Sequence, residues 1–197
     1  MTKGKPKPLN DPRHTATHEA GHAVIARVLT LLCGGATIVP DFEAGAAGHA
    51  ITDDPLECTS EWEMRDKFRH DNAVWHGRII AYMAGAEAEQ MLLGVTYGGD
   101  GDDRYQIELM AEQLDCDPSQ WVSREARLRA MTRMLIRRHR DRIERVADAL
   151  LVKRKLSAKQ IDKLAGRSIN DLGLPLSSSK RLSRAALRYQ RWRCSRK

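Results

Sequence analysis

The sequence predicts a mainly α-helical domain with one small β-hairpin. Three observations lead to this fold class. The 197 residues are 42% apolar but only 5% aromatic, a composition typical of a helix-rich globule that can bury a core. Apolar residues recur at helical spacing through long segments, and the strand signals are limited to two short runs. No stretch approaches the roughly 18 uninterrupted apolar residues that a membrane span needs.

Start and stop signals divide most of the chain into helical segments. The first segment begins where Asp11 can cap a helix and Pro12 suits the first turn, and Gly34 marks a stop beyond its end. Ser157 is a similar cap for a short last helix. The helices expected from these signals span residues 12–32, 71–93, 103–114, 123–152 and 157–166.

Two short runs with strand character lie between the first two helices. Residues 36–39 read Ala-Thr-Ile-Val and end at Pro40, and residues 50–52 follow a connection rich in glycine and alanine. Short β-rich runs joined in this way are typical of a hairpin. We therefore expect these two runs to pair.

Positive charge is concentrated at the two ends of the chain. The net charge is +7, yet residues 176–197 alone hold eight basic and no acidic side chains, and residues 1–13 have a net charge of +3. The residues between these ends are mildly acidic. We therefore expect a basic arm over 1–11, one folded domain over 12–166 and a basic tail over 167–197. The tail is either a contact for nucleic acid or another polyanion, or a solvated segment.

The four cysteines are scattered and form no Cys-x-x-Cys pair. This pattern disfavours a cysteine zinc site or a disulfide framework and indicates a reducing, cytoplasmic location. A secretory signal is not expected, because three prolines, Glu19 and two histidines interrupt the order of segments that such a signal needs.

The sharpest motif is His18-Glu19-Ala-Gly-His22, inside the first predicted helix. Histidines four residues apart on a helix lie on the same face, one turn from each other, so both imidazoles can reach one Zn²⁺ ion. Glu19 is rotated away from that axis and would reach a water on the metal. It is therefore the candidate base that removes the proton of that water during attack on a carbonyl.

A zinc site of this type needs a third protein ligand and an open position. No histidine or glutamate follows within the next turns, and the best remote candidates are Asp100, Asp102 and Asp103. All three lie in a glycine-rich loop at a predicted helix start, where carboxylates are favoured by the helix dipole. The same loop could also be only a capped turn. Its spacing excludes an EF-hand calcium loop.

Five segments of the chain carry further motifs: residues 15–23, residues 38–40 with 48–49, and residues 83–89, 99–103 and 143–164. The first of them contains the His-Glu-x-x-His motif. Together they resemble the zinc-peptidase domain of the FtsH-type, membrane-anchored ATP-dependent proteases (peptidase family M41). Residues 38–40 and 48–49 resemble the strand pair beside that family's active site, and residues 83–89 resemble its Gly-x-x-Ala-Glu helix. Residues 99–103 resemble its Gly-x-x-x-Asp segment, and residues 143–164 resemble its last helices.

The resemblance implies a helical, zincin-like peptidase fold with zinc as its cofactor and peptides or unfolded proteins as substrates. It assigns the third zinc ligand to Asp103. It also suggests that Glu89 accepts the spare N–H of a zinc-bound histidine and so fixes that imidazole. Glu89 could alternatively lie on the solvent-exposed edge of its helix, without such a role. Glu87, two residues away, is expected to point elsewhere and to be solvated.

The candidate substrate-binding residues are His49, Ala50 and Ile51, because an extended peptide can pair with the edge of a strand. His49 could alternatively be a partly exposed strand residue without such a role.

Three tryptophans are expected in the core or at subunit contacts, and the four histidines outside the metal motif and the strand are expected at the surface. These residues are Trp62, Trp75, Trp121, His14, His70, His76 and His139.

The chain also departs from the family, because it has no P-loop: its one Gly-Lys pair, Gly4-Lys5, is followed by Pro6. A separate ATPase or adaptor would have to unfold substrates that are not already unfolded. The resemblance also implies a tendency to form homo-oligomers. The predicted function is a zinc-dependent metalloendopeptidase. The alternative is a catalytically silent peptide-binding or regulatory module with a polyanion-binding tail. A different zinc hydrolase is a third, minor hypothesis.

Overall fold

The computed structural model describes residues 11–29, 31, 33–40, 47–52, 73–114 and 117–166. The chain divides into two compact units, Met1–Ala165 and Gly166–Lys197, and the first contains every element described below. The predicted basic tail over 167–197 lies outside the described residues, as do residues 1–10 of the predicted arm over 1–11, Trp62 and His70.

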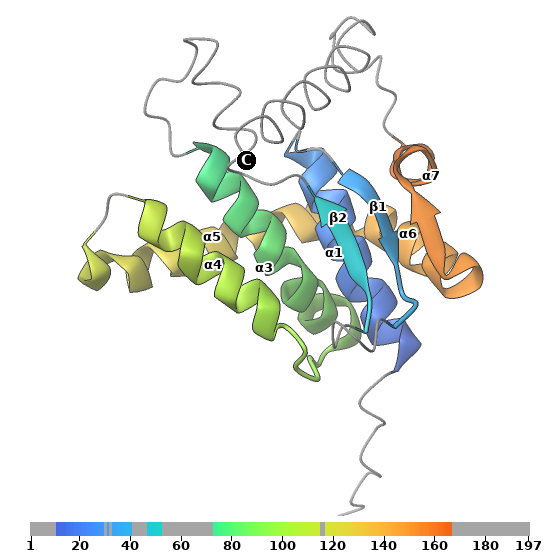
Figure 1. The fold of residues 1–197 in the computed structure, drawn as a ribbon, viewed down its shortest axis with the longest axis horizontal. Coiled ribbons are helices and arrows are strands. Elements are labelled where there is room, and N and C mark those ends of the chain that lie inside the picture. Colours follow the sequence, from blue (N-terminus) through green and yellow to red (C-terminus); the bar gives the residue numbers. More distant parts are fainter. Residues whose placement is uncertain are drawn as a thin grey trace, which may run out of the picture. The chain divides into compact units, whose positions relative to one another are not determined.

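Helices dominate the described part of the chain, with a small sheet against them (Figure 1). This arrangement confirms the predicted mainly α fold class. The helices are α1 (Pro12–Val28), α3 (Ala73–Leu93), α4 (Gly101–Gln113), α5 (Pro118–Arg138), α6 (Arg140–Lys153) and α7 (Ala158–Leu164). The strands are β1 (Cys33–Thr37), β2 (His49–Thr52) and β3 (Lys155–Ser157). No helix among the described residues combines the length and apolar character needed to cross a bilayer.

Helices α1 and α3 pack closely along a seam of small residues. Ala20, Ala84 and Ala88 are fully buried there. A β-carbon built on Gly21 would lie 2.6 Å from the carbonyl oxygen of Ala84 and 2.9 Å from the β-carbon of Ala88. Only glycine therefore permits this separation of the two helices. Figure 1 shows α3 between α4 and α1, and α3 contacts both of them.

The sheet has three antiparallel strands in the order β2-β1-β3, one strand more than the predicted hairpin. The hairpin itself pairs Thr37 with His49 and Ala36 with Ala50. The strand β3 was missed because it is three residues long and follows α6 without a turn sequence. Its middle residue, Leu156, pairs with Ala36 and is almost completely buried, which fixes the strand against the core.

Two of the expected helices, those over 12–32 and 123–152, differ most from the structure. The long helix expected over 123–152 is two helices, because the backbone at His139 leaves helical geometry between α5 and α6. Helix α5 begins at Pro118, where the carboxylate of Asp117 accepts the N–H of Ser119 at 2.8 Å. The helix expected over 12–32 ends at Val28. The predicted Ser157 cap of the last helix is present as a capping box with Gln160.

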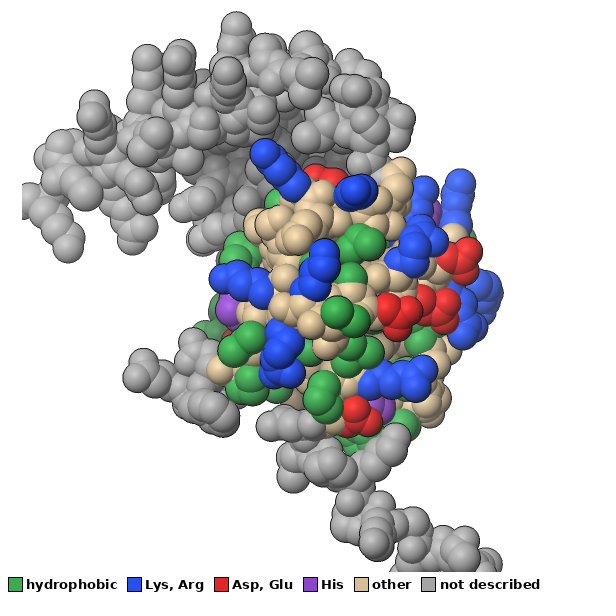
Figure 2. All heavy atoms as spheres, turned by 90° about the vertical axis from the view of Figure 1, so that its right-hand side faces the viewer, with side chains coloured by type: hydrophobic (Ala, Val, Ile, Leu, Met, Phe, Trp, Pro, Cys, Tyr) green, Lys and Arg blue, Asp and Glu red, His purple; other side chains and the backbone are tan. Residues whose placement is uncertain are grey.

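The face on the right of Figure 1 carries dispersed charge. Figure 2 shows its Lys and Arg side chains separated by apolar and acidic side chains. The exposed basic residues of α6 and α7 include Lys153, Lys159 and Lys163. A mixed distribution of this kind is typical of a solvated surface. Trp75 and Trp121, expected in the core or at contacts, are half-buried and pack against the core.

Candidate metal centre

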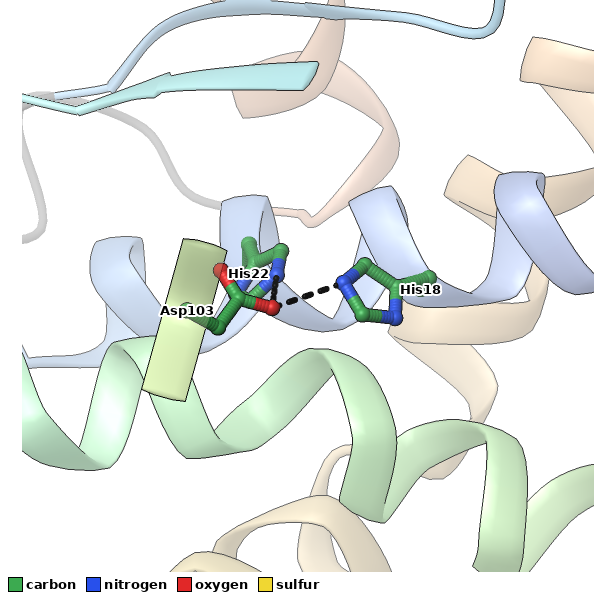
Figure 3. A group of neighbouring side chains, drawn as sticks. All are labelled: His18, His22 and Asp103. Carbon is green, nitrogen blue, oxygen red and sulfur yellow. Dashed lines mark hydrogen bonds and ion pairs between the residues drawn. The ribbon is translucent and has the colours of Figure 1, made fainter. Parts of the chain in front are cut away.

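Helix α1 presents three histidines at intervals of four residues, His14, His18 and His22. Such spacing places them on the same face of the helix. This face meets the middle of α3 and the first turn of α4, which brings Asp103 opposite the second and third histidines (Figure 3). The candidate centre is therefore assembled from helices that are about 80 residues apart in sequence.

Asp103 is the aspartate of the glycine-rich loop that reaches the histidines. Its Oδ2 lies 2.9 Å from Nε2 of His18 and 3.2 Å from Nε2 of His22. The three potential ligand atoms lie within 4.8 Å of one another, and no other group of this kind occurs among the described residues. Asp100 instead pairs with Arg104 at 2.8 Å, and Asp102 is an exposed residue of the same turn.

The Nδ1 atoms of His18 and His22 each form a hydrogen bond to an acceptor oxygen. Nδ1 of His18 lies 2.7 Å from Oε1 of Glu89, and Nδ1 of His22 donates to the carbonyl oxygen of Ala81 at 2.7 Å. A carbonyl or carboxylate oxygen can only accept, so both Nδ1 atoms carry the hydrogen. The two Nε2 atoms are then directed towards Asp103, in the orientation that a metal ligand needs.

The same contacts shift the proton affinities of the metal-free centre. Burial disfavours the charged form of His18, but its hydrogen bonds to Asp103 and Glu89 outweigh burial and raise its pKa to about 10. Burial likewise opposes the charge on His22, yet Asp103 raises the pKa of that histidine. For Asp103, burial is outweighed by His22 and His18, which lower the pKa of its carboxyl group.

Glu19 lies beside the three-residue group without belonging to it. The side chain is almost completely buried, and this burial raises the pKa of its carboxyl group although His22 and His18 work in the opposite direction. A β-carbon on Gly48 would lie 3.2 Å from Oε1 of Glu19. The strand segment before β2 therefore passes directly over the carboxylate.

A cavity of about 780 Å³ opens onto these residues. His18, His22, Asp103 and Glu19 line it, as do the tyrosines Tyr82 and Tyr97. Of the three predicted substrate-binding residues, His49 and Ala50 also line the cavity. Ile51 is exposed and is not part of the lining. The cavity thus joins the edge strand of the sheet to the histidine face of α1.

His14 is not the surface residue that the sequence suggested. It is buried, and its Nδ1 lies 2.9 Å from Oε2 of Glu89, the carboxylate that also contacts His18. His14 stands four residues before His18, so helical spacing places it on the same face of α1 as the metal motif. The interval between these two histidines was the available signal. His76 and His139, grouped with it, are half-buried rather than fully exposed.

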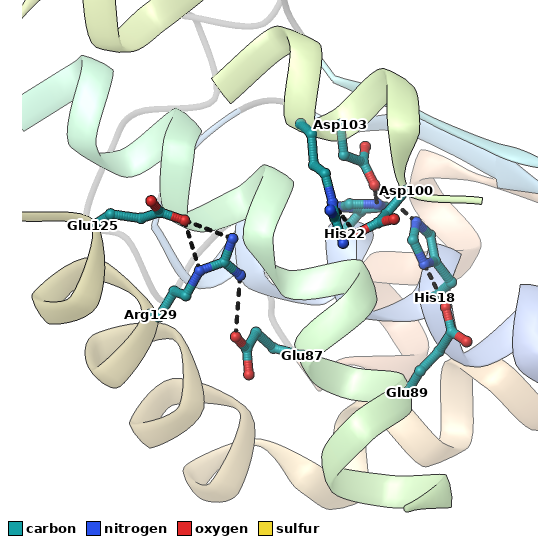
Figure 4. A network of polar contacts seen from close by, with 9 residues as sticks. His18, His22, Glu87, Glu89, Asp100, Asp103, Glu125 and Arg129 are labelled. Atoms are coloured by element: carbon teal, nitrogen blue, oxygen red, sulfur yellow. Dashed lines mark hydrogen bonds and ion pairs between the residues drawn. The ribbon is translucent and has the colours of Figure 1, made fainter. Parts of the chain in front are cut away.

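Glu87 is likewise not solvated. Its side chain is buried against α5, where Arg133 donates to it at 2.6 Å. Arg129, one turn away on the same helix, donates to it at 3.2 Å (Figure 4). Glu89 is on a different face of α3, towards His18, so two nearby glutamates serve two different helix contacts. Glu89 is buried too, which contradicts the alternative of a solvent-exposed helix edge.

Comparison with known proteins finds a similarity to a zinc metalloprotease. A segment of 115 residues is 30% identical to the ATP-dependent zinc metalloprotease FtsH of Pelobacter propionicus. The alignment covers 57% of this chain and 16% of that protein, so the chain spans only a small part of its relative's length. No protein-family profile matches the chain. The similarity is distant and links the chain to metalloproteases in general terms.

Proposed function

We propose that this protein is a zinc-dependent metalloendopeptidase that hydrolyses peptide bonds in peptides or unfolded proteins. The observation that carries the proposal is the convergence of His18, His22 and Asp103 beside the buried carboxylate of Glu19. The distant similarity to a zinc metalloprotease supports the same reaction class.

The donor set fits zinc. Two imidazole nitrogens and one carboxylate oxygen are ligands that Zn²⁺ accepts in catalytic sites, where a fourth position stays open. Both histidines present Nε2 because Nδ1 is engaged by Glu89 or by Ala81. Gly85 of α3 faces these Nε2 atoms and leaves space that any side chain would fill. We therefore assign His18, His22 and Asp103 as the ligands.

Zinc, when bound, supplies a Lewis acid that acidifies water and polarises a scissile carbonyl. Glu19 holds and moves the proton: its carboxylate takes it from the attacking water and returns it to the departing amine nitrogen. A raised pKa suits this role, because the group must both accept and release a proton near neutral pH. Glu89 keeps His18 in the correct tautomer.

The sheet edge provides a place for an extended substrate. Within the described residues, β2 pairs on one side only, with β1, and its other edge is where an extended peptide could add a strand. His49 and Ala50 line the cavity and would lie along the bound chain, with Ile51 at its outer end. Antiparallel pairing there would hold a peptide bond against the centre without selecting a sequence. Folded substrates would require a separate ATPase or adaptor.

The Glu19→Gln variant tests the proposal. We expect it to retain one zinc per chain and to lose cleavage of unfolded casein by about 100-fold or more, because the amide cannot take the proton. The exposed Glu108→Gln on α4 is the matched control and should cleave normally. Undiminished cleavage by Glu19→Gln would refute the mechanism. Zinc binding without any cleavage by the wild type would support the silent binding module instead.

A further inference from the structure

The buried histidine one turn before the metal motif is not used by the proposed mechanism. We propose that His14 is a positioning residue of the candidate metal centre: it fixes Glu89 so that Glu89 can orient His18. This inference rests on the proposed function, because it assigns a role towards the same zinc site. His14 acts through Glu89 and is not assigned as a zinc ligand.

The first step of the argument concerns the two oxygens of Glu89. One accepts from Nδ1 of His18 at 2.7 Å and the other from Nδ1 of His14 at 2.9 Å. The carboxylate is buried on α3, where an oxygen without a donor is costly. His14 therefore supplies the donor that the second oxygen requires.

The second step concerns the orientation of the carboxylate. The terminal torsion of a glutamate is broad, so one hydrogen bond leaves the carboxylate plane free to turn. Donors on both oxygens fix that plane. Because His14 and His18 are one helical turn apart on α1, the helix presents both donors to the same carboxylate. The orientation of His18 thereby depends on a residue that does not reach the metal position.

The third step links His14 to the segment that carries Asp103. The ring of His14 packs against Tyr97, with ring centroids 4.2 Å apart. Tyr97 stands in the connection between α3 and α4, six residues before Asp103. His14 thus contacts both the carboxylate that holds one proposed ligand and the segment that leads to another.

The test is zinc affinity, measured by competition with a chromophoric chelator, for the wild type and three variants of the full chain. His14→Ala removes the donor. His14→Asn keeps an N–H close to the position of Nδ1, whereas His14→Gln places its N–H farther out. We expect about tenfold weaker zinc binding for His14→Ala and His14→Gln, and binding close to wild type for His14→Asn. Circular dichroism of each metal-free variant reports folding separately.

Each outcome is informative. Equal affinity of His14→Ala and wild type would overturn the inference while leaving the proposed function intact. Equally weak binding by His14→Asn and His14→Ala would also overturn it, because the N–H would then not be the property that matters. A wild type without zinc affinity would refute the proposed function and this inference together. A wild type that binds zinc but cleaves nothing would refute only the proposed reaction.

Discussion

A β-carbon on Gly85 would lie 2.5 Å from Nε2 of His18, closer than two such atoms can approach. The same carbon would also overlap Nε2 of His22. Gly85 lies in the middle of α3, so the helix comes close to both imidazoles exactly where a side chain would compete with a metal ion. The contact atoms are the ends of two side chains, which can rotate away without moving any backbone.

We therefore expect Gly85→Ala to abolish zinc binding while the helical fold persists. The new methyl group would push both imidazoles out of the position that converges with Asp103, and alanine itself favours the helix by about 1 kcal/mol over glycine. Zinc content after dialysis and circular dichroism measure the two effects. Gly77→Ala is the matched control, since a β-carbon at that position of α3 meets no atom of the described residues within 4 Å. Stoichiometric zinc in Gly85→Ala would contradict this geometry.

Gly21→Ala should instead reduce the stability of the fold, because its new methyl group would meet backbone atoms that cannot rotate away. The carbonyl of Ala84 lies 2.6 Å from that position, and a helix must shift to make room. We expect the free energy of unfolding to fall by about 1–2 kcal/mol, the cost of overpacking reduced by the helix preference of alanine. Urea denaturation of the metal-free protein measures it. A variant as stable as the wild type would show that α1 and α3 can separate without cost.

The sequence could predict the part of the site that lies on one helix. His18, Glu19 and His22 belong to a single local pattern, and helical spacing alone determines which of them share a face. The carbonyl of Ala81 could not be anticipated, because any residue has one and only the packing of α3 on α1 selects it. The same spacing rule also places His14, four residues before His18, on this face.

Longer-range features escaped prediction for physical reasons. The burial of Glu87 depends on two arginines more than 40 residues away, so local polarity suggested solvent. The break at His139 has neither glycine nor proline, and the helical pattern continues across it. The strand β3 is stabilised by pairing with β1 rather than by its own sequence. The fold class itself followed from composition and periodicity.

Arg133→Met should destabilise the protein by about 1–2 kcal/mol, because the buried carboxylate of Glu87 would lose its shortest hydrogen bond. Solvent screening moderates the loss, since the Arg133 side chain is 54% exposed. Urea denaturation measures this effect. Arg137→Met, an exposed position on the same helix, should change stability by less than about 0.5 kcal/mol. Equal effects of the two substitutions would mean that the Glu87 contact contributes nothing.

The pKa shifts of the centre predict that the metal-free protein loses stability both at high pH and at low pH. His18 has a pKa raised from 6.5 to about 10, so its contribution to stability is complete below pH 6.5 and is lost as the pH rises towards 10. Asp103 has a lowered pKa, so its contribution is present above its ordinary value of 3.8 and is lost as the pH falls below it. Without metal, both contributions are therefore present together between about pH 3.8 and 6.5, where the centre stabilises the fold most.

Zinc binding should therefore release protons and strengthen with pH. A zinc ligand must be a neutral imidazole, whereas His18 in the metal-free chain is protonated at pH 7, and the pKa of His22 is raised as well. Zinc must displace at least one proton, so its affinity should rise by about tenfold per pH unit between pH 6 and 8. Calorimetry in two buffers of different ionisation enthalpy counts the protons released. An affinity independent of pH, with no proton released, would show that these histidines are not protonated before zinc arrives.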